Sequence, residues 1–227
     1  MTANERVGLA KQIIYGLSVL LFSPLLLVGF LSHPDLFSLR LTTTAAELAA
    51  NFHHNAAFHI GHLIVIVAIP LIVAELLCCA EMLRGKGAWL GFVGAALGIV
   101  GAIVLAIDKG ALCLVLSAFD TLPEDQFAAF VPYLQVIVDR TGLLFIVYVL
   151  PLLPLGAIIQ AIGLLRERHI APWQGAAVIV GLLLLNNPDI EIFSSIGAAL
   201  MTAGYAPLGL AVLRAGSGRS GMAPVAA

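Results

Sequence analysis

The chain has 227 residues, of which 61% are hydrophobic and only 11% are charged. A typical soluble domain carries roughly 25% charged residues, so this chain has too little polar surface to cover itself in water. Its mean hydropathy of +1.06 indicates an integral membrane protein whose main partner is the lipid bilayer. The net charge of −2 gives no support to a nucleic-acid partner, which would need a clustered basic face.

Six apolar segments follow one another along the chain. A helix needs roughly 20 apolar residues to cross a hydrocarbon core of about 30 Å. The predicted spans are 13–31, 57–83, 88–107 (or on to 119), 141–165, 174–185 and 188–213. The fifth is short. We therefore predict an all-α, six-helix transmembrane bundle that forms one domain over residues 1–215. The segment 216–227, rich in Gly, Ala and Ser, is predicted to be a disordered cytoplasmic tail.

Basic residues predict the orientation of this bundle, because cytoplasmic loops retain Lys and Arg. With both termini in the cytoplasm, eight of the eleven basic residues fall on the inner side. Only Arg40, Lys109 and Arg140 fall outside or at the outer boundary. The inverted topology would place those eight outside, so we predict a multi-pass protein with both termini inside the cell.

The segments between the spans also carry structural signals. Thr44 and Glu47 have the spacing of a capping box, which predicts that the second helix begins near Ala45. We expect this helix to run without a break to Arg84. Residues 127–138 of the next outer loop predict a helix at the membrane interface.

A group of polar residues gathers on the second predicted helix. At about 100° per residue, one face carries Asn51, His54, Asn55 and His62, with His59 at its edge. His59 and His62 are three residues apart, the spacing at which two imidazoles can share a ligand.

Helix rise predicts which other residues share the depth of these histidines near the outer leaflet. The predicted neighbours come from three further segments: Asp108 and Lys109; Asp139 and Arg140; and Asp189 and Glu191. One hypothesis is a transition-metal site of His54, His59, His62, Asp189 and Glu191, suited to zinc, copper or iron. Asn51, Asn55, Asp108, Lys109, Asp139 and Arg140 would bind a small ligand. The alternative is that these groups only pair with one another and with lipid headgroups.

Glu75 stands apart, roughly 27 Å below the outer start of its helix. Ionisable groups within a membrane are costly and mark candidate sites. Glu75 either hydrogen-bonds a neighbour or faces headgroups, or it belongs to a ligand or proton pathway.

Small residues recur along the third span at Gly91, Gly94, Gly98 and Gly101. Such a ladder lets two helices approach closely. It would serve either packing inside the bundle or a homo-oligomer.

Two stretches resemble a known family. They are GLLRERHIAPWQG over residues 163–175 and AAFHIGHL over residues 56–63. Together they resemble an uncharacterised bacterial family of six-helix membrane proteins, a domain of unknown function. The resemblance implies six helices and a bacterial inner membrane, and it implies no activity or catalytic residue.

Two function classes remain open from the sequence. The first is a protein that binds a small ligand, a metal or a membrane-protein partner through its outer polar cluster, and that in one version transports it. The second is a small metal- or quinone-dependent membrane enzyme that uses His59 and His62.

Overall fold

The protein is an all-α membrane bundle. The computed structural model describes residues 2–187 and 190–215, and every regular element in that part of the chain is helical. Six long helical segments make up the bundle: α1 (Ala3–Leu31), α3 (Ala56–Met82), α4 (Ala88–Lys109), α8 (Leu152–Arg166), α9 (Pro172–Leu185) and α10 (Glu191–Ala215). Shorter elements are α2 (Ala45–Phe52), η1 (Gly110–Val115), α5 (Leu116–Phe119), α6 (Glu124–Phe130), η2 (Val131–Leu134), α7 (Gln135–Val138) and η3 (Gly142–Val149).

Five helical segments of the described chain are long and apolar enough to cross a membrane. The third of them runs from α4 through the π-helical η1 to Phe119, and the fourth combines η3 with α8. The remaining candidate, α9, has 14 residues and spans only about 21 Å. A multi-pass membrane protein is therefore established, while the count of six spans stays a prediction. The predicted tail and residues 188–189 lie outside the described residues.

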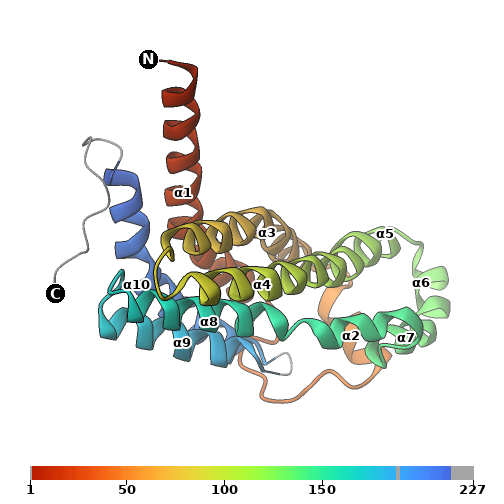
Figure 1. The fold of residues 1–227 in the computed structure, drawn as a ribbon. Helices are drawn as coiled ribbons and strands as arrows, with labels where there is room; N and C mark the ends of the chain where they lie inside the picture. Colours follow the sequence, from red (N-terminus) through yellow and green to blue (C-terminus); the bar gives the residue numbers. More distant parts are fainter. Residues whose placement is uncertain (1, 188–189, 216–227) are drawn as a thin grey trace.

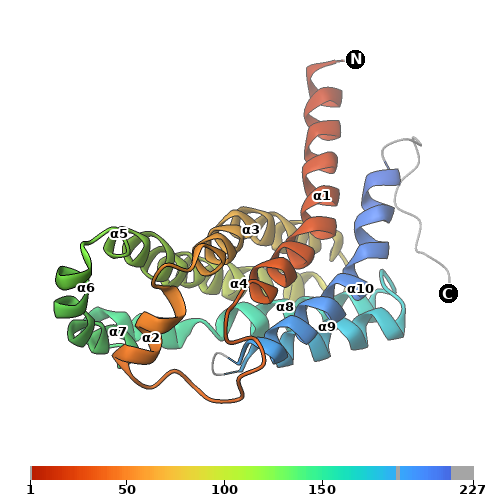
Figure 2. The same cartoon turned by 180° about the vertical axis from the view of Figure 1, so that it is seen from behind.

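The long helices form a closed ring. Each contacts its neighbour in chain order, from α1 to α3, α4, α8, α9 and α10, and α10 contacts α1 again. Figures 1 and 2 show the N-terminal half of α1 and the C-terminal half of α10 leaving the bundle side by side. The Gln12 side-chain amide joins them by donating to the Val212 carbonyl at 2.6 Å.

The two ends of the ring differ (Figure 1). We call the end that carries α2 and α5–α7 the outer end, and the end with the short loops 83–87 and 167–171 the inner end. At the outer end, α2, α5, α6 and η2 enclose a small apolar core of their own, which we call the cap. Its most buried members include Phe52, Phe58, Leu116, Phe127 and Leu134.

Small residues bring the ring helices close together. A Cβ added to Gly156 of α8 would lie 2.4 Å from the Gly94 carbonyl oxygen of α4. A Cβ added to Gly101 of α4 would lie 2.2 Å from the Leu153 backbone nitrogen of α8. Gln160 is fully buried and donates to the carbonyls of Leu76 and Gly91. The glycine ladder thus packs α4 against neighbouring helices of the same chain. Helices embedded in lipid depend on such close van der Waals contact to associate.

The prediction of one continuous second helix is wrong. The capping box at Thr44 and the start at Ala45 are confirmed, but α2 ends at Phe52 and α3 begins at Ala56. Between them His53 is extended and His54 adopts a left-handed φ of 54°. Asn55 then caps α3 by accepting from the Phe58 amide. A polar Asn cap and a long-range contact described below outweigh the helical propensity of this stretch.

Candidate functional site

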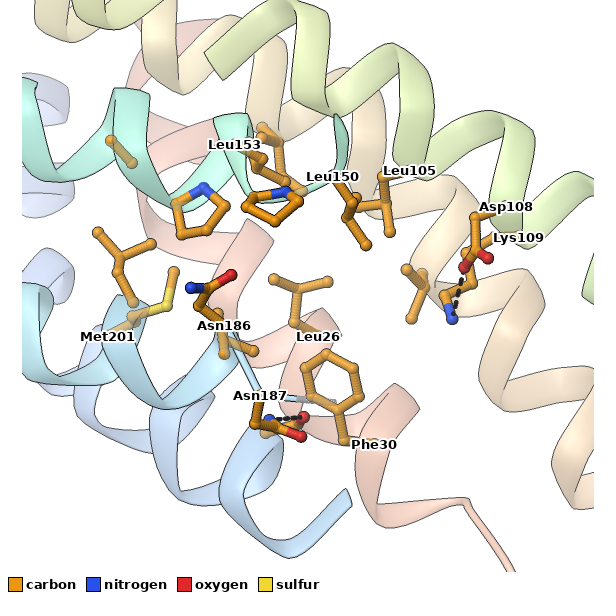
Figure 3. Close-up of a pocket in the computed structure, with 18 of the residues that line it drawn as sticks. Leu26, Phe30, Leu105, Asp108, Lys109, Leu150, Leu153, Asn186, Asn187 and Met201 are labelled. Carbon is orange, nitrogen blue, oxygen red and sulfur yellow. Dashed lines mark hydrogen bonds and ion pairs between the residues drawn. The ribbon is translucent and has the colours of Figure 1, made fainter. Parts of the chain in front are cut away.

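One cavity of about 220 Å³ lies inside the ring, and all six long helices contribute to its wall. Its apolar middle is lined by residues from several of them, including Phe22, Leu26, Ile72, Leu153, Leu182 and Met201. Figure 3 shows Leu26, Leu105 and Met201 directed into this space from three different helices, with Leu150 reaching it from the turn before α8. The wall therefore depends on the assembled ring, not on one helix pair.

Polar side chains gather where the cavity meets the outer end. They are Asp108, Lys109, Arg140, Asn186, Asn187, Glu191 and Ser194. The expected meeting of α4, the start of the fourth span and the α9–α10 turn at one depth is thus observed. Both signs of charge are present, so this mouth can hold a headgroup that is anionic, cationic or zwitterionic.

Several contacts hold these mouth residues in place. Lys109 Nζ lies 3.1 Å from Asp108 Oδ2, and both side chains are only 15% exposed. The Arg140 guanidinium lies over the Tyr148 ring at 5.4 Å. Asn187 donates to Ser194 Oγ at 2.9 Å, one of the interactions drawn in Figure 3. The mouth is therefore a built polar surface and not a set of mobile surface charges.

A second cavity of about 140 Å³ adjoins the first and reaches under the cap. The two share Asp108, Lys109, Arg140, Val147 and Glu191 in their linings. The second adds His33, Asp35, Asn51 and His62. A continuous polar zone thus connects the cap with the central cavity.

His62 belongs to this zone. It is 3% exposed, and its ring lies 4.9 Å from that of His33. Its Nδ1 lies 2.9 Å from the Phe58 carbonyl, which can only accept, so Nδ1 carries the proton and Nε2 stays an acceptor. His33 in turn contacts Asp35 at 3.0 Å and Glu191 at 3.7 Å. The His33 hydrogen bond, against the opposing effect of burial, lowers the pKa of the Asp35 carboxyl.

Glu75 lies at the opposite, inner end of the central cavity. It is 2% exposed and accepts a hydrogen bond from Cys79 Sγ at 3.1 Å, with Tyr205 adjoining it. Of the alternatives left open by the sequence, exposure to headgroups is therefore wrong. The carboxyl group faces the cavity from within the bundle.

A separate cluster of imidazoles and carboxylates lies on the cap. His53 Nδ1 is 2.7 Å from Asp120 Oδ1, and His54 Nε2 is 2.7 Å from Glu124 Oε1. His59 Nε2 approaches the other oxygen of Asp120 at 3.2 Å. We call these five residues the cap cluster.

Asp120 organises this cluster and explains the helix break. The same Oδ1 that meets His53 also accepts from the His54 backbone amide at 3.0 Å. Burial opposes the charged form of Asp120, but the amide of His54 and the two imidazoles outweigh it and lower its pKa. Burial likewise opposes protonation of His53, yet its hydrogen bonds to Asp120 and Glu124 raise its pKa. The pKa of Glu124 is lowered by its bonds to His54 and His53.

The structure regroups the residues predicted for one metal site. His54 and His59 point to the cap cluster, whereas His62 points to the polar zone with Glu191. A three-residue step leaves the two α3 side chains roughly 60° apart around the helix, so each meets a different neighbour. The helix break detaches His54 from their face altogether. Asp189 lies outside the described residues.

The remaining predicted ligand residues have structural roles nearby. Asn51 lies 3.5 Å from Asp35 at the second cavity, and Asn55 caps α3. Asp139 accepts from Gln135 at 2.9 Å and lines neither cavity. Sequence reasoning missed His53, Asp120 and Glu124 as members of this cluster. The sequence indicated only that all three lie near the outer end of the bundle. It also missed Tyr205, which carries no polar pattern around it.

No protein-family model, curated protein or solved structure matches the chain significantly. The resemblance to the uncharacterised six-helix family therefore stays a prediction.

Proposed function

We propose that this membrane protein binds a small amphiphilic molecule in the cavity enclosed by its ring of helices. The observation that carries the proposal is the composition of the cavity wall. All six long helices line it, with mixed charges and amides at the outer mouth and aliphatic and aromatic side chains within. A concave apolar site with a few convergent polar groups is the usual form of a small-molecule site.

The chemistry of the wall suggests how such a ligand would lie. A polar headgroup would meet Lys109, Arg140 and Asn186, and an apolar body would extend between Leu26 and Met201. A cavity of roughly 150 Å³ holds one benzene molecule. The central cavity is modestly larger, so we expect a compact ligand or one short chain of a larger lipid.

The proposed setting is a bacterial inner membrane with both termini in the cytoplasm. In this orientation the mouth and the cap face the outer leaflet, and ligand enters from that side. Support comes from the eight basic residues that this topology retains inside.

Transport is a second candidate function, favoured by one observation. Glu75 combines full burial with a position at the inner end of the same cavity. Buried carboxyl groups in membrane proteins commonly mark ion or substrate pathways. Coupling of ligand movement to protonation of Glu75 would make the protein a carrier.

An enzyme using His59 and His62 together has less support. His59 meets Asp120, while His62 meets Phe58 and His33. A metal or quinone held between the two imidazoles would require both side chains to leave these partners.

Filling the cavity tests the proposal. The full chain in lipid nanodiscs would be titrated with short single-chain amphiphiles that share one alkyl chain and carry a carboxylate, trimethylammonium or phosphocholine head. Met201→Trp places a large ring in the cavity, and Ile103→Trp places the same ring on the exposed face of α4. We expect Met201→Trp to weaken binding by about tenfold or more, or ~1.4 kcal/mol, and Ile103→Trp to leave it unchanged.

Calorimetry would report the affinity, and thermal unfolding would confirm that both variants are folded. Equal affinities for the wild type and Met201→Trp would reject the cavity as the binding site. Absence of saturable binding for all three headgroups would reject an amphiphilic ligand of this size.

A further inference from the structure

The cap cluster has the composition of a metal site that is distinct from the cavity. His53, His54 and Asp120 each offer one ligand atom, and these three atoms lie within 4.8 Å of one another. None of the five cluster residues appears in the described lining of either cavity. The cluster therefore needs a role of its own, whatever the cavity binds.

We propose that His53, His54 and Asp120 bind a divalent transition metal of the zinc type, with Glu124 as a fourth ligand. Such an ion would join the α2–α3 junction to the turn between α5 and α6. These segments are about 67 residues apart in the chain.

The distances suit this assignment. Zinc bonds of about 2.0–2.1 Å in a tetrahedron place ligand atoms roughly 3.3 Å apart. His53 Nδ1 lies 2.7 Å from Asp120 Oδ1, and His54 Nε2 lies 2.7 Å from Glu124 Oε1, so an ion between these two pairs would need each pair to open by only about 0.6 Å. The His54 and Glu124 side chains are 66% and 74% exposed, so they can turn toward an ion without repacking the cap.

Contacts behind the ligands fix the less mobile half of the site. The His53 ring stacks on Phe127 with centroids 3.7 Å apart and planes at 6°. Asp120 is held by the His54 amide and by His59 Nε2. Partners of this kind orient ligands and are an integral part of metal sites. A metal ion bound at His53 Nδ1 would take the place of the hydrogen that this nitrogen donates to Asp120.

The donor set also selects the metal. Two imidazoles with one or two carboxylates favour zinc, copper or iron over magnesium and calcium, which prefer sets made of oxygen. The exposed position on the cap gives the ion direct access from solution. The competing explanation is that the cluster is a hydrogen-bonded clamp without metal.

Metal titration of the full chain distinguishes the two. Protein stripped with a chelator would be titrated with zinc chloride by calorimetry and with cobalt chloride by visible absorption, which reports the ligand geometry. We expect saturation at one ion per chain. His53→Gln combined with His54→Gln keeps polar side chains but removes both imidazoles, and should weaken binding by at least about tenfold. Asp120→Asn, nearly identical in shape, should also weaken it.

The inner end of the protein supplies a matched control. His169 Nε2 lies 3.4 Å from Glu167 Oε2, an imidazole–carboxylate pair without a second imidazole. His169→Gln should leave the titration unchanged. Zinc affinity that is equal in the wild type and in the folded double variant, or that falls equally in His169→Gln, would overturn the proposal and leave the hydrogen-bonded clamp. Thermal unfolding of each variant without metal verifies that it is folded.

Discussion

The helices pack differently at the two ends of the ring. At the inner end, short loops join helices that glycines bring close together, as where a Cβ added to Gly91 would lie 3.2 Å from the backbone of Ala80. At the outer end, the helices part around a cavity with charged walls, and a cap with an aromatic core stands over it. Lipid supplies no hydrophobic force between helices, so closeness comes from small side chains. The hydrophobic effect can stabilise the apolar core of the cap. Close packing therefore characterises the inner end, and the polar groups of the proposed ligand site gather at the outer end.

The largest effect should come from adding one methyl group where α8 packs closely on α4, midway along the ring. A Cβ at Gly156 would meet the Gly94 oxygen and the Gly98 nitrogen at 2.4 Å, and backbone atoms cannot turn away as side chains do. We expect Gly156→Ala to destabilise the bundle by about 3 kcal/mol or more. Thermal unfolding in detergent would measure the change.

Gly110, at the outer end of α4, is the matched control because an added Cβ there would have no neighbour within 4 Å. Gly110→Ala should keep or slightly raise stability, since Ala favours helix. Equal losses in the two variants would show that the close packing of α8 on α4 is no more sensitive to an added methyl group than the outer end of α4 is.

A smaller effect is expected at the loops that close the inner end. Glu167 Oε1 accepts from the Gly87 amide at 2.6 Å and from the Gly85 amide at 3.1 Å. The Gly87 bond is the main cause that lowers the pKa of Glu167 below its ordinary value of 4.5. The carboxylate therefore contributes stability that is fully present above pH 4.5 and is lost as pH falls through the lowered pKa.

Glu167→Gln keeps an oxygen acceptor but loses its charge. It should cost about 1 kcal/mol at neutral pH, because bonds to charged acceptors are stronger than neutral ones. Unfolding followed from neutral pH into the acid range should show the wild type converging on the variant. A gap between the two that persists at low pH would show that the charge is not what stabilises these loops.

The sequence predicted the ring better than the contacts at its outer end. The length of the apolar segments located the long helices, and the short fifth segment was observed as α9. The break at residues 53–55 was not predictable, because it depends on Asp120 accepting the His54 amide from 66 residues away. Of the cap cluster, His54 and His59 were among the predicted ligands, but their partners His53, Asp120 and Glu124 were missed for the same reason. Helical periodicity reports local structure, and it placed His62 and Glu191 at one end without showing which histidines share a partner.

Glu75 lies where the closed and open halves meet, and its replacement tests whether that boundary is a passage. The side-chain amide introduced by Glu75→Gln can still accept from Cys79, so stability should change by less than about 1 kcal/mol. Proton-coupled movement of the tightest-binding amphiphile should be abolished, since an amide cannot titrate. Proteoliposomes containing a pH-sensitive dye would measure the flux.

The control for this last experiment is Glu81→Gln. Glu81 lies on α3, as Glu75 does, but its carboxylate is exposed and is paired with Lys11 of α1 at 2.7 Å. It should leave both ligand binding and proton flux unchanged. Proton-coupled flux that survives in Glu75→Gln would reject the carrier function and leave Glu75 as a hydrogen-bonded wall of the binding cavity. Flux lost equally in both variants would show that general damage to α3, and not titration at the inner end of the cavity, is responsible. Loss in Glu75→Gln alone, with binding retained, would make the carboxyl group the point at which the closed end admits a proton.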